Sequence, residues 1–118
     1  IDGKVFTWGR GKYGQLGTGT YSSSAFPIHV SSLQEPVLKI VCGNDHTLLL
    51  GKSGAVYAFG RGNVGQTGLQ TRDHTTTPQR VDTLAPYQVV QIAAGANHSV
   101  ALTDANQVFC FGNGGGGQ

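Results

Sequence analysis

The sequence predicts an all-β fold: a fragment of a β-propeller made of about two four-stranded antiparallel blades. Three observations lead to this prediction: a repeat, short runs of β-branched and aromatic residues, and nineteen glycines among 118 residues. Glycine at about twice its usual frequency is typical of many tight turns between short strands. The glycines lack the three-residue period of collagen, and the stretches between them are too apolar for a disordered linker.

The repeat has steps of 51 and 52 residues, read from the starting positions of one pattern. Val5 begins V-F-T-W-G-R-G-K-Y-G-Q-L-G, and closely related runs begin at Val56 and Val108. A second block, G-x-x-H-[ST], ends at Thr47 and recurs with its end at Ser99. We therefore treat the chain as a single partial propeller, residues 1–118, divided into repeats at 5–55 and 56–107 and a truncated repeat at 108–118.

Each complete repeat is expected to contain four short strands. The runs at 5–8, 56–59 and 108–111 show no polar alternation, which predicts strands buried on both faces. Turn-forming segments separate the last two runs from upstream strands at 46–50 and 98–102, which predicts hairpins. Further strands are expected at 28–33, 38–42, 79–84 and 89–93, and no stretch has a capped helical period. Four strands per unit of about fifty residues are typical of propeller blades.

The two cysteines fit this register. Cys110 occupies the position of Thr7 and Ala58, and Cys42 occupies that of Ala94. Because the repeat uses small residues at both positions, we expect the cysteines to fill the core rather than to form a disulfide or a redox site.

These motifs resemble the regulator-of-chromosome-condensation repeat family. The strand followed by G-x-G-x-x-G-Q-L-G, and the later G-x-x-H-[ST] step, carry the resemblance over almost the whole chain. The second repeat departs from it at Thr67, where leucine is usual, and the third at Gly116, where a larger residue is common. The resemblance implies a propeller of about seven blades. We therefore expect a segment of a longer protein, with the remaining blades supplied by the rest of that protein or by self-assembly.

Two motifs suggest chemistry that their context argues against. Gly9 to Gly14 is a formal G-x-G-x-x-G after a strand, as in dinucleotide-binding turns. It recurs from Gly60 and Gly112 with no helix following, so we interpret it as a structural turn and expect no cofactor. His46 and His98 occur once per repeat, too far apart for a shared metal, and are expected to bond to loop backbone. We assign no catalytic, cofactor-binding or metal-binding residue.

Partner-binding candidates are sought where the repeats differ, since binding residues concentrate on loops of a rigid scaffold. Residues 20–26 and 70–77 occupy the same position in the two repeats but have unlike sequences. They could contact a partner, or they could be solvated loops with no function. The G-R-G turns add two arginines that could line one face of the ring or bond within the turn. The candidates are Arg10, Lys12, Tyr21, Arg61, Arg72, Asp73 and His74.

The function expected is that of a protein-protein interaction scaffold rather than an enzyme. The alternative is a guanine-nucleotide exchange factor for a Ran-like small GTPase, the activity for which the family is named. The two repeats are regular and contain no long insertion that could serve as an exchange wedge. The fold also hosts light sensing by a tryptophan cluster, but Trp8 is the one tryptophan. Related propellers are joined to ubiquitin ligases and ciliary proteins, and fold does not imply function.

Charge and hydropathy limit the classes of partner that the chain is expected to bind. The net charge is +2, and no run of like charge suggests a nucleic-acid tract, so chromatin binding is unsupported. No window approaches the ~18 apolar residues of a membrane span, and we expect no membrane partner. A protein partner, with a small GTPase as one candidate, is the expectation. The family and the lack of a disulfide pattern favour an intracellular location, in the cytoplasm or nucleus.

Overall fold

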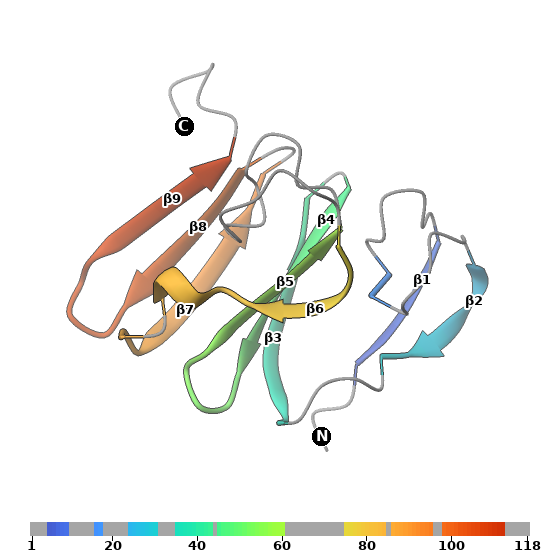
Figure 1. Ribbon diagram of the computed structural model, residues 1–118, viewed down its shortest axis with the longest axis horizontal. Helices are drawn as coiled ribbons and strands as arrows, with labels where there is room; N and C mark the ends of the chain where they lie inside the picture. Colours follow the sequence, from blue (N-terminus) through green and yellow to red (C-terminus); the bar gives the residue numbers. More distant parts are fainter. Residues whose placement is uncertain are drawn as a thin grey trace.

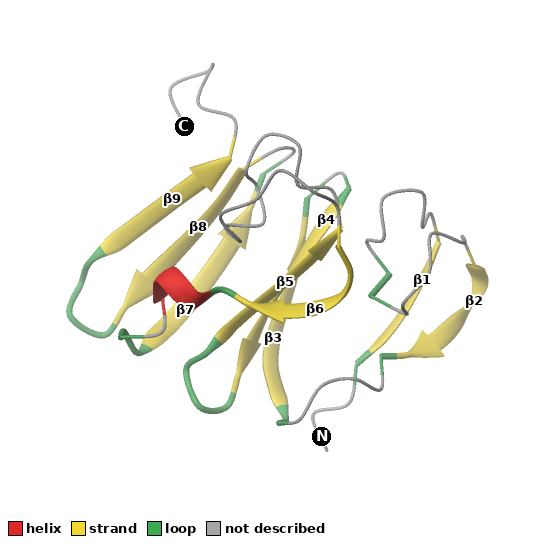
Figure 2. Ribbon diagram, viewed as in Figure 1, coloured by secondary structure: helices red, strands yellow, loops and turns green. Residues whose placement is uncertain are grey.

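The computed structural model describes residues 5–9, 16–17, 24–30, 35–43, 45–60, 75–84, 86–95 and 98–112. Nine strands in these ranges form three antiparallel sheets (Figures 1 and 2). The first sheet holds β1 (Phe6–Gly9) and β2 (Ser24–His29). The second has the order β3 (Val37–Cys42), β4 (His46–Gly51), β5 (Val56–Gly60) and β6 (Thr75–Arg80). The third holds β7 (Val89–Ala94), β8 (His98–Thr103) and β9 (Val108–Gly112), and a short 3-10 helix η1 (Asp82–Leu84) precedes it.

The three sheets stand side by side as propeller blades. Figure 1 shows them stacked in chain order, with the four-stranded sheet in the middle. The second and third sheets approach each other along their first strands, where β7 contacts both β3 and β4. Blades that converge at one edge are the radial arrangement of a propeller, so the predicted fold class is confirmed.

The second and third sheets each draw on two sequence repeats. The four-stranded sheet takes β3 and β4 from residues 37–51 and β5 and β6 from residues 56–80. The repeat boundary at 55 and 56 therefore lies in the turn inside one blade. Successive repeats are consequently tied together by β-ladder hydrogen bonds as well as by side-chain packing between blades.

The outer strands begin earlier than predicted. Strands expected at 28–33 and 79–84 are instead Ser24–His29 and Thr75–Arg80, and residues 82–84 form a 3-10 turn. Pro27 and Pro78 each lie in an edge strand, where a missing N–H need not break the ladder. The ends of the two expected loops, 24–26 and 75–77, are thus strand.

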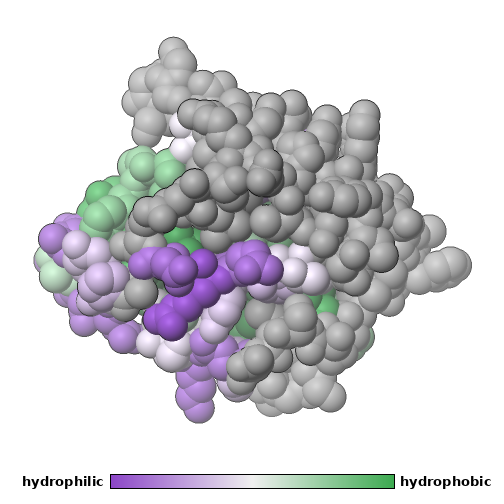
Figure 3. Space-filling view, viewed as in Figure 1, coloured by the Kyte–Doolittle hydropathy of each residue, from purple (hydrophilic) through white to green (hydrophobic). Residues whose placement is uncertain are grey.

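The core lies between the blades. Leu48, Leu50, Val56 and Ala58 of the middle sheet pack with Val89, Ile92 and Ala101 of the third, together with Val81 and Leu84 from the connection. On the other face, Leu49 and Phe59 pack with Val5 and Val30 of the first sheet. Both faces of the middle sheet are therefore apolar. Hydrophilic residues gather along β6 and η1 on the face shown in Figure 3.

Burial on both faces holds for β4 and β5 of the middle blade and not for the strands of the outer blades. Every residue of β4, and all but Tyr57 of β5, is buried, whereas β9 is exposed or half-buried along its length. The prediction of strands buried on both faces is therefore wrong for β9 and for Phe6 of β1. The prediction of core cysteines is also wrong, since Cys42 and Cys110 are free and exposed. In the described ranges, the outer sheets have a neighbouring sheet on one face only.

Candidate functional site

All seven partner-binding candidates lie outside the described residues and stay predictions. They are Arg10, Lys12, Tyr21, Arg61, Arg72, Asp73 and His74. The site is therefore sought in the strands and the turns between them. One turn, G-x-x-H, was singled out by the sequence, and its glycine and histidine are described in both copies.

The G-x-x-H turn folds the histidine ring back over its glycine. The N–H of Gly43 donates to the carbonyl of His46 at 2.9 Å, and that of Gly95 donates to the carbonyl of His98 at 3.0 Å. A Cβ added to Gly43 would lie 2.1 Å from Cε1 of His46, and one on Gly95 would lie 1.9 Å from Cε1 of His98. Glycine is thus required by a close approach of the ring to the backbone.

His46 joins two blades. Its side chain is 1% exposed, and its Nε2 lies 2.9 Å from the hydroxyl oxygen of Ser99 on β8 of the next sheet. Sequence reasoning expected a structural histidine bonded to its own loop. The structural role agrees with the geometry, but the hydrogen-bond partner is a side chain of the neighbouring blade. Ser99 follows His98 in the G-x-x-H-[ST] motif, so the last residue of the second motif contacts the histidine of the first.

Burial lowers the pKa of His46. The backbone of His98 and the charge of Asp45 favour the charged form, while the His98 ring opposes it, and the net direction is downward. The folded chain therefore holds His46 neutral, whereas the unfolded chain binds a proton below its ordinary pKa of about 6.5.

The stability of the chain should consequently depend on pH. The contribution of His46 is fully present above a pH of about 6.5 and is lost as the pH falls below it, because protons then bind the unfolded state preferentially. We expect the free energy of unfolding, measured with urea at several pH values, to fall across this window. His46→Gln, which cannot titrate, should flatten that part of the profile. An equally steep profile in His46→Gln would assign the effect to other groups.

Glu35 ties a loop to the turn between β4 and β5. Its carboxylate accepts hydrogen bonds from the backbone N–H of Ser53 at 2.8 Å, the Ser53 hydroxyl at 2.9 Å and the Tyr57 hydroxyl at 2.6 Å. Burial alone would raise the pKa of Glu35, but the bonds from Tyr57 and Ser53 outweigh it and, with the charge of Arg80, lower that pKa. The contact therefore holds the carboxylate ionised.

The next blade has an aromatic contact where this blade has the contact between Glu35 and Tyr57. Tyr87 and Phe109, the counterparts of Glu35 and Tyr57, bring their ring centroids to 4.8 Å at an angle of 49°. One fold position thus accepts a polar or an aromatic contact. These two blades differ in chemistry at this end of the sheets, although their backbones repeat.

Exposed apolar side chains gather on the first strands of the blades. Leu38 on β3 is 66% exposed and Val90 on β7 is 51% exposed, and both sit at the irregularity that each strand makes with its hairpin partner. A bulge of this kind re-aims a side chain away from the sheet. Strands β3 and β7 are in contact, and we call their exposed residues, which include Lys39 and Gln91, the β3–β7 surface.

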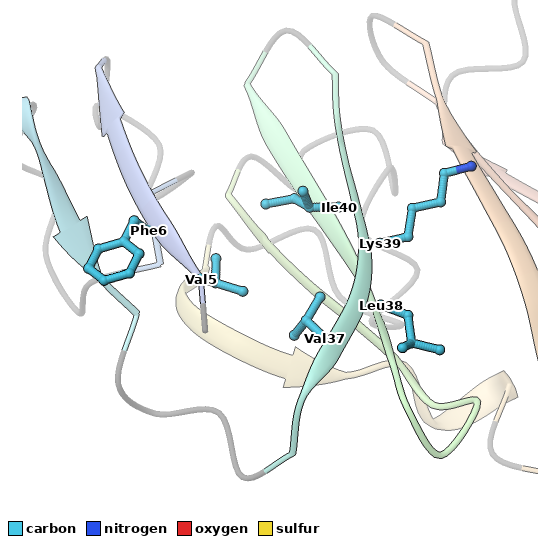
Figure 4. Close-up of a pocket in the computed structure, with 6 residues that line it drawn as sticks. All are labelled: Val5, Phe6, Val37, Leu38, Lys39 and Ile40. Carbon is cyan, nitrogen blue, oxygen red and sulfur yellow. The ribbon is translucent and has the colours of Figure 1, made fainter. Parts of the chain in front are cut away.

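A pocket of about 240 Å³ opens beside this surface, between β1 and β3. Figure 4 shows Val37 and Ile40 pointing from β3 toward Val5, which directly precedes β1, whereas Leu38 and Lys39 point the other way. The lining is Val5, Phe6, Val37, Leu38, Lys39 and Ile40. Five apolar residues and one lysine suit an apolar occupant rather than a polar small molecule.

The described ranges contain neither a group of metal-ligating side chains nor a helix that could span a membrane. No three His, Cys, Asp or Glu residues there lie close enough together to hold a metal ion. None of the helical structure there is long and apolar enough to cross a membrane. The first glycine of the G-x-G-x-x-G run ends a strand with positive φ at Gly60 (108°) and Gly112 (119°), and the rest of each run lies outside the described residues.

A profile of the regulator of chromosome condensation (RCC1) repeat matches residues 2–50 and 53–102, and a second RCC1 repeat profile matches 37–66 and 89–118. The chain belongs to the RCC1 repeat family. The human probable E3 ubiquitin-protein ligase HERC3 is 40% identical over 99% of this RCC1 chain, which covers 11% of that protein. The human E3 ubiquitin-protein ligase HERC2 is 36% identical over 99% of the chain, which covers 2% of it. The chain thus spans a small part of the length of these relatives.

Solved structures agree with the fold. The crystal structure of human WBSCR16 superposes with a TM-score of 0.87 at 31% identity, over 98% of this RCC1 chain and 30% of that one. Prp20p of Saccharomyces cerevisiae, described with its binding properties to Gsp1p and histones, superposes with a TM-score of 0.80 at 28% identity, over 92% of this chain and 28% of that one. The chain is therefore similar to about a third of each of these structures.

Proposed function

We propose that this chain is a protein-binding module, the RCC1-like part of a larger protein, and that a partner contacts the β3–β7 surface. The observation that carries the proposal is the exposure of Leu38 and Val90 at equivalent bulges of two adjacent blades. Exposed apolar side chains beside polar ones are typical of protein interfaces. Lys39 and Gln91 supply that rim.

The rigidity of the blades supports this role. The second and third sheets are joined by a continuous apolar cluster and by the hydrogen bond between His46 and Ser99. A surface held in this way loses little conformational freedom when a partner binds, which favours affinity. This segment covers 11% of the length of HERC3. In a ubiquitin ligase of that kind, such a segment would recruit a protein, and the transfer of ubiquitin would belong to the rest of the ligase.

The test is quantitative affinity capture of the intact parent protein. Leu38→Asp combined with Val90→Asp should reduce at least one captured protein by about tenfold or more, because a charge would be buried at the interface. Ala105→Asp, in the exposed turn between β8 and β9, is the matched control and should capture the same set as the unchanged protein. Identical capture by all three proteins would exclude the β3–β7 surface as the contact.

The second candidate is exchange activity on a small GTPase. Its support is the similarity to Prp20p, whose structure was described with binding to Gsp1p and histones. Release of labelled GDP from a GTPase of this type, accelerated by the parent protein, is the expected result. No acceleration, together with a partner lost in the Leu38→Asp and Val90→Asp protein, would leave the binding module as the function.

A further inference from the structure

The turn between β4 and β5, residues 52–55, presents a serine hydroxyl to solvent. Lys52 and Ser53 are exposed, and glycines border them at Gly51 and Gly54. Gly54 has a φ of 88°, which a residue with a side chain rarely adopts. Exposed loop tips with small and polar residues are preferred sites of attack by enzymes such as proteases. Ser53 is therefore placed where a modifying enzyme can reach it.

The exposure of Ser53 is a property of the turn rather than of its place in the chain. The third sheet lies against the middle sheet on one face, and Ser53 stays exposed beside it. The equivalent turn between β8 and β9, residues 104–107, has the four-stranded middle sheet on its other side, and all of its residues are exposed. Both turns project from the same end of the blades (Figure 1). A neighbouring blade on either side thus leaves this turn uncovered.

The Ser53 hydroxyl is in direct contact with the carboxylate of Glu35. It donates to Oε2 of Glu35 at 2.9 Å, and the backbone N–H of Ser53 donates to Oε1 at 2.8 Å. The carboxylate lies so close to the turn that a Cβ added to Gly51 would stand 2.5 Å from Cδ of Glu35. Hydrogen bonds to an ionised acceptor are stronger than those between neutral groups. The turn therefore holds one negative charge and has little room for another.

The same turn is bonded to the chain at the start of β3 and of β7. The backbone N–H of Lys52 donates to the carbonyl of Pro36 at 2.9 Å, and that of Val89 donates to the carbonyl of Gly54 at 3.2 Å. Pro36 directly precedes β3, and Val89 is the first residue of β7. A change in the turn would consequently reach both strands of the β3–β7 surface.

We propose that Ser53 is a phosphorylation site and that its modification expels Glu35 from the turn. In the reaction the Ser53 oxygen bonds to the γ-phosphorus of ATP, the bond from that phosphorus to ADP breaks, and the hydroxyl proton passes to the catalytic carboxylate of a protein kinase. The product has no O–H to donate and carries about 1.5 to 2 negative charges at neutral pH. Because a phosphate beside a carboxylate is repelled, the two groups cannot share the turn.

The charges near Ser53 indicate the class of kinase. Lys52 directly precedes the serine, and residues 46–60 contain no acidic side chain. Charge complementarity favours a serine/threonine kinase with an acidic substrate groove. Arg80 on β6 also acts on the charge of Glu35, but one guanidinium cannot neutralise both a carboxylate and a phosphate. This inference goes beyond the proposed function and does not depend on it.

The third sheet provides a matched comparison. The N–H of Asp104 donates to the carbonyl of the residue before β7 at 2.9 Å, so the backbone of its turn repeats that of the β4–β5 turn. Ala105 is the counterpart of Ser53, and Tyr87 is the counterpart of Glu35. A negative charge at position 105 would therefore face an aromatic residue where a charge at position 53 faces a carboxylate.

Phosphate incorporation into the intact parent protein is the first test. The protein is incubated with Mg²⁺, ATP and a serine/threonine kinase that prefers basic substrates. Mass spectrometry should find phosphate on Ser53, and Ser53→Ala should remove it. Ala105→Ser places a hydroxyl in the equivalent exposed turn after Asp104, and it should take up less phosphate by about tenfold or more. No phosphate on Ser53, or equal incorporation at the two positions, would overturn the proposal.

Amide hydrogen exchange of the parent protein tests the expulsion of Glu35. Phosphorylation of Ser53, or Ser53→Asp, should speed exchange of the Lys52 and Val89 amides by about tenfold or more, because their bonds to the loop and to the turn loosen. Ser53→Asn, equal in size but neutral, should change these rates by less than about threefold. In a Glu35→Gln background, Ser53→Asp should add less than about twofold, since the repulsion is gone.

Ala105→Asp is the control in the third sheet. It should leave the exchange of the Asp104 amide unchanged, because Tyr87 replaces the carboxylate there. Equal rates in Ser53→Asn and Ser53→Asp would show that the loss of the hydroxyl, not the added charge, opens the turn. That result would overturn the proposal, as would an undiminished effect of Ser53→Asp in Glu35→Gln.

Discussion

Gly43→Ala should lower the free energy of unfolding by about 3 kcal/mol, the upper part of the range for inserting a methyl group into a filled site. The added Cβ would lie 2.1 Å from the ring of His46 and 2.5 Å from the backbone oxygen of Gly95 in the next blade. His46 is buried and bonded to Ser99, so the ring cannot turn aside without breaking that contact. Urea unfolding of the variant and the unchanged chain, at neutral pH, measures the loss.

Gly95→Ala is the matched control for this substitution. Its Cβ would meet the His98 ring at 1.9 Å, but His98 is only half-buried and can turn to another rotamer. We expect a loss of about 1 kcal/mol, which His98→Ala should relieve in a double-mutant cycle. His46→Ala should relieve the Gly43→Ala loss only in part, since the Gly95 oxygen remains in place. Equal losses at the two glycines would show that burial of the ring does not set the cost.

Phe59→Ala should cost about 3 to 5 kcal/mol, the range for removing a buried aromatic ring. Phe59 is fully buried and packs with Val5, Val30 and Leu49 between the first two sheets. Gly17 lies against the ring: a Cβ there would stand 2.8 Å from it, so the surrounding backbone already approaches as closely as it can. A cavity at this point would therefore loosen the first sheet from the second. Urea unfolding, with hydrogen exchange of β1 and β2 as a local readout, measures the effect.

Phe6→Ala is the control for Phe59→Ala. Phe6 is 52% exposed, so removal of its ring should cost less than about 1 kcal/mol. Phe59→Leu keeps most of the volume and should lose about 1 to 2 kcal/mol, which gives a graded reading if Phe59→Ala does not fold. Similar losses for Phe6→Ala and Phe59→Ala would contradict a core located between the blades.

Several features were predictable because they depend on local spacing. The fifty-residue repeat, the glycine-bounded strands and the H-[ST] step all reflect one supersecondary unit copied along the chain, and copies must fold alike. The hairpins at 46–60 and 98–112 follow directly from apolar runs joined by turn residues. The outer strands were less predictable, since Pro27 and Pro78 argue against a strand unless its edge position is known.

The sequence by itself determined the repeat, the propeller class and the small set of residues that every blade requires. Only the tertiary structure decided which copies of those residues are buried. Ile40 and Ile92, or Cys110 and Ala58, are equivalent in the repeat but differ in exposure, because burial depends on whether another sheet lies against that face. It also decided that His46 bonds across to Ser99 rather than to its own loop. Packing between blades brings together residues about fifty positions apart, and such a contact cannot be predicted from a local sequence pattern.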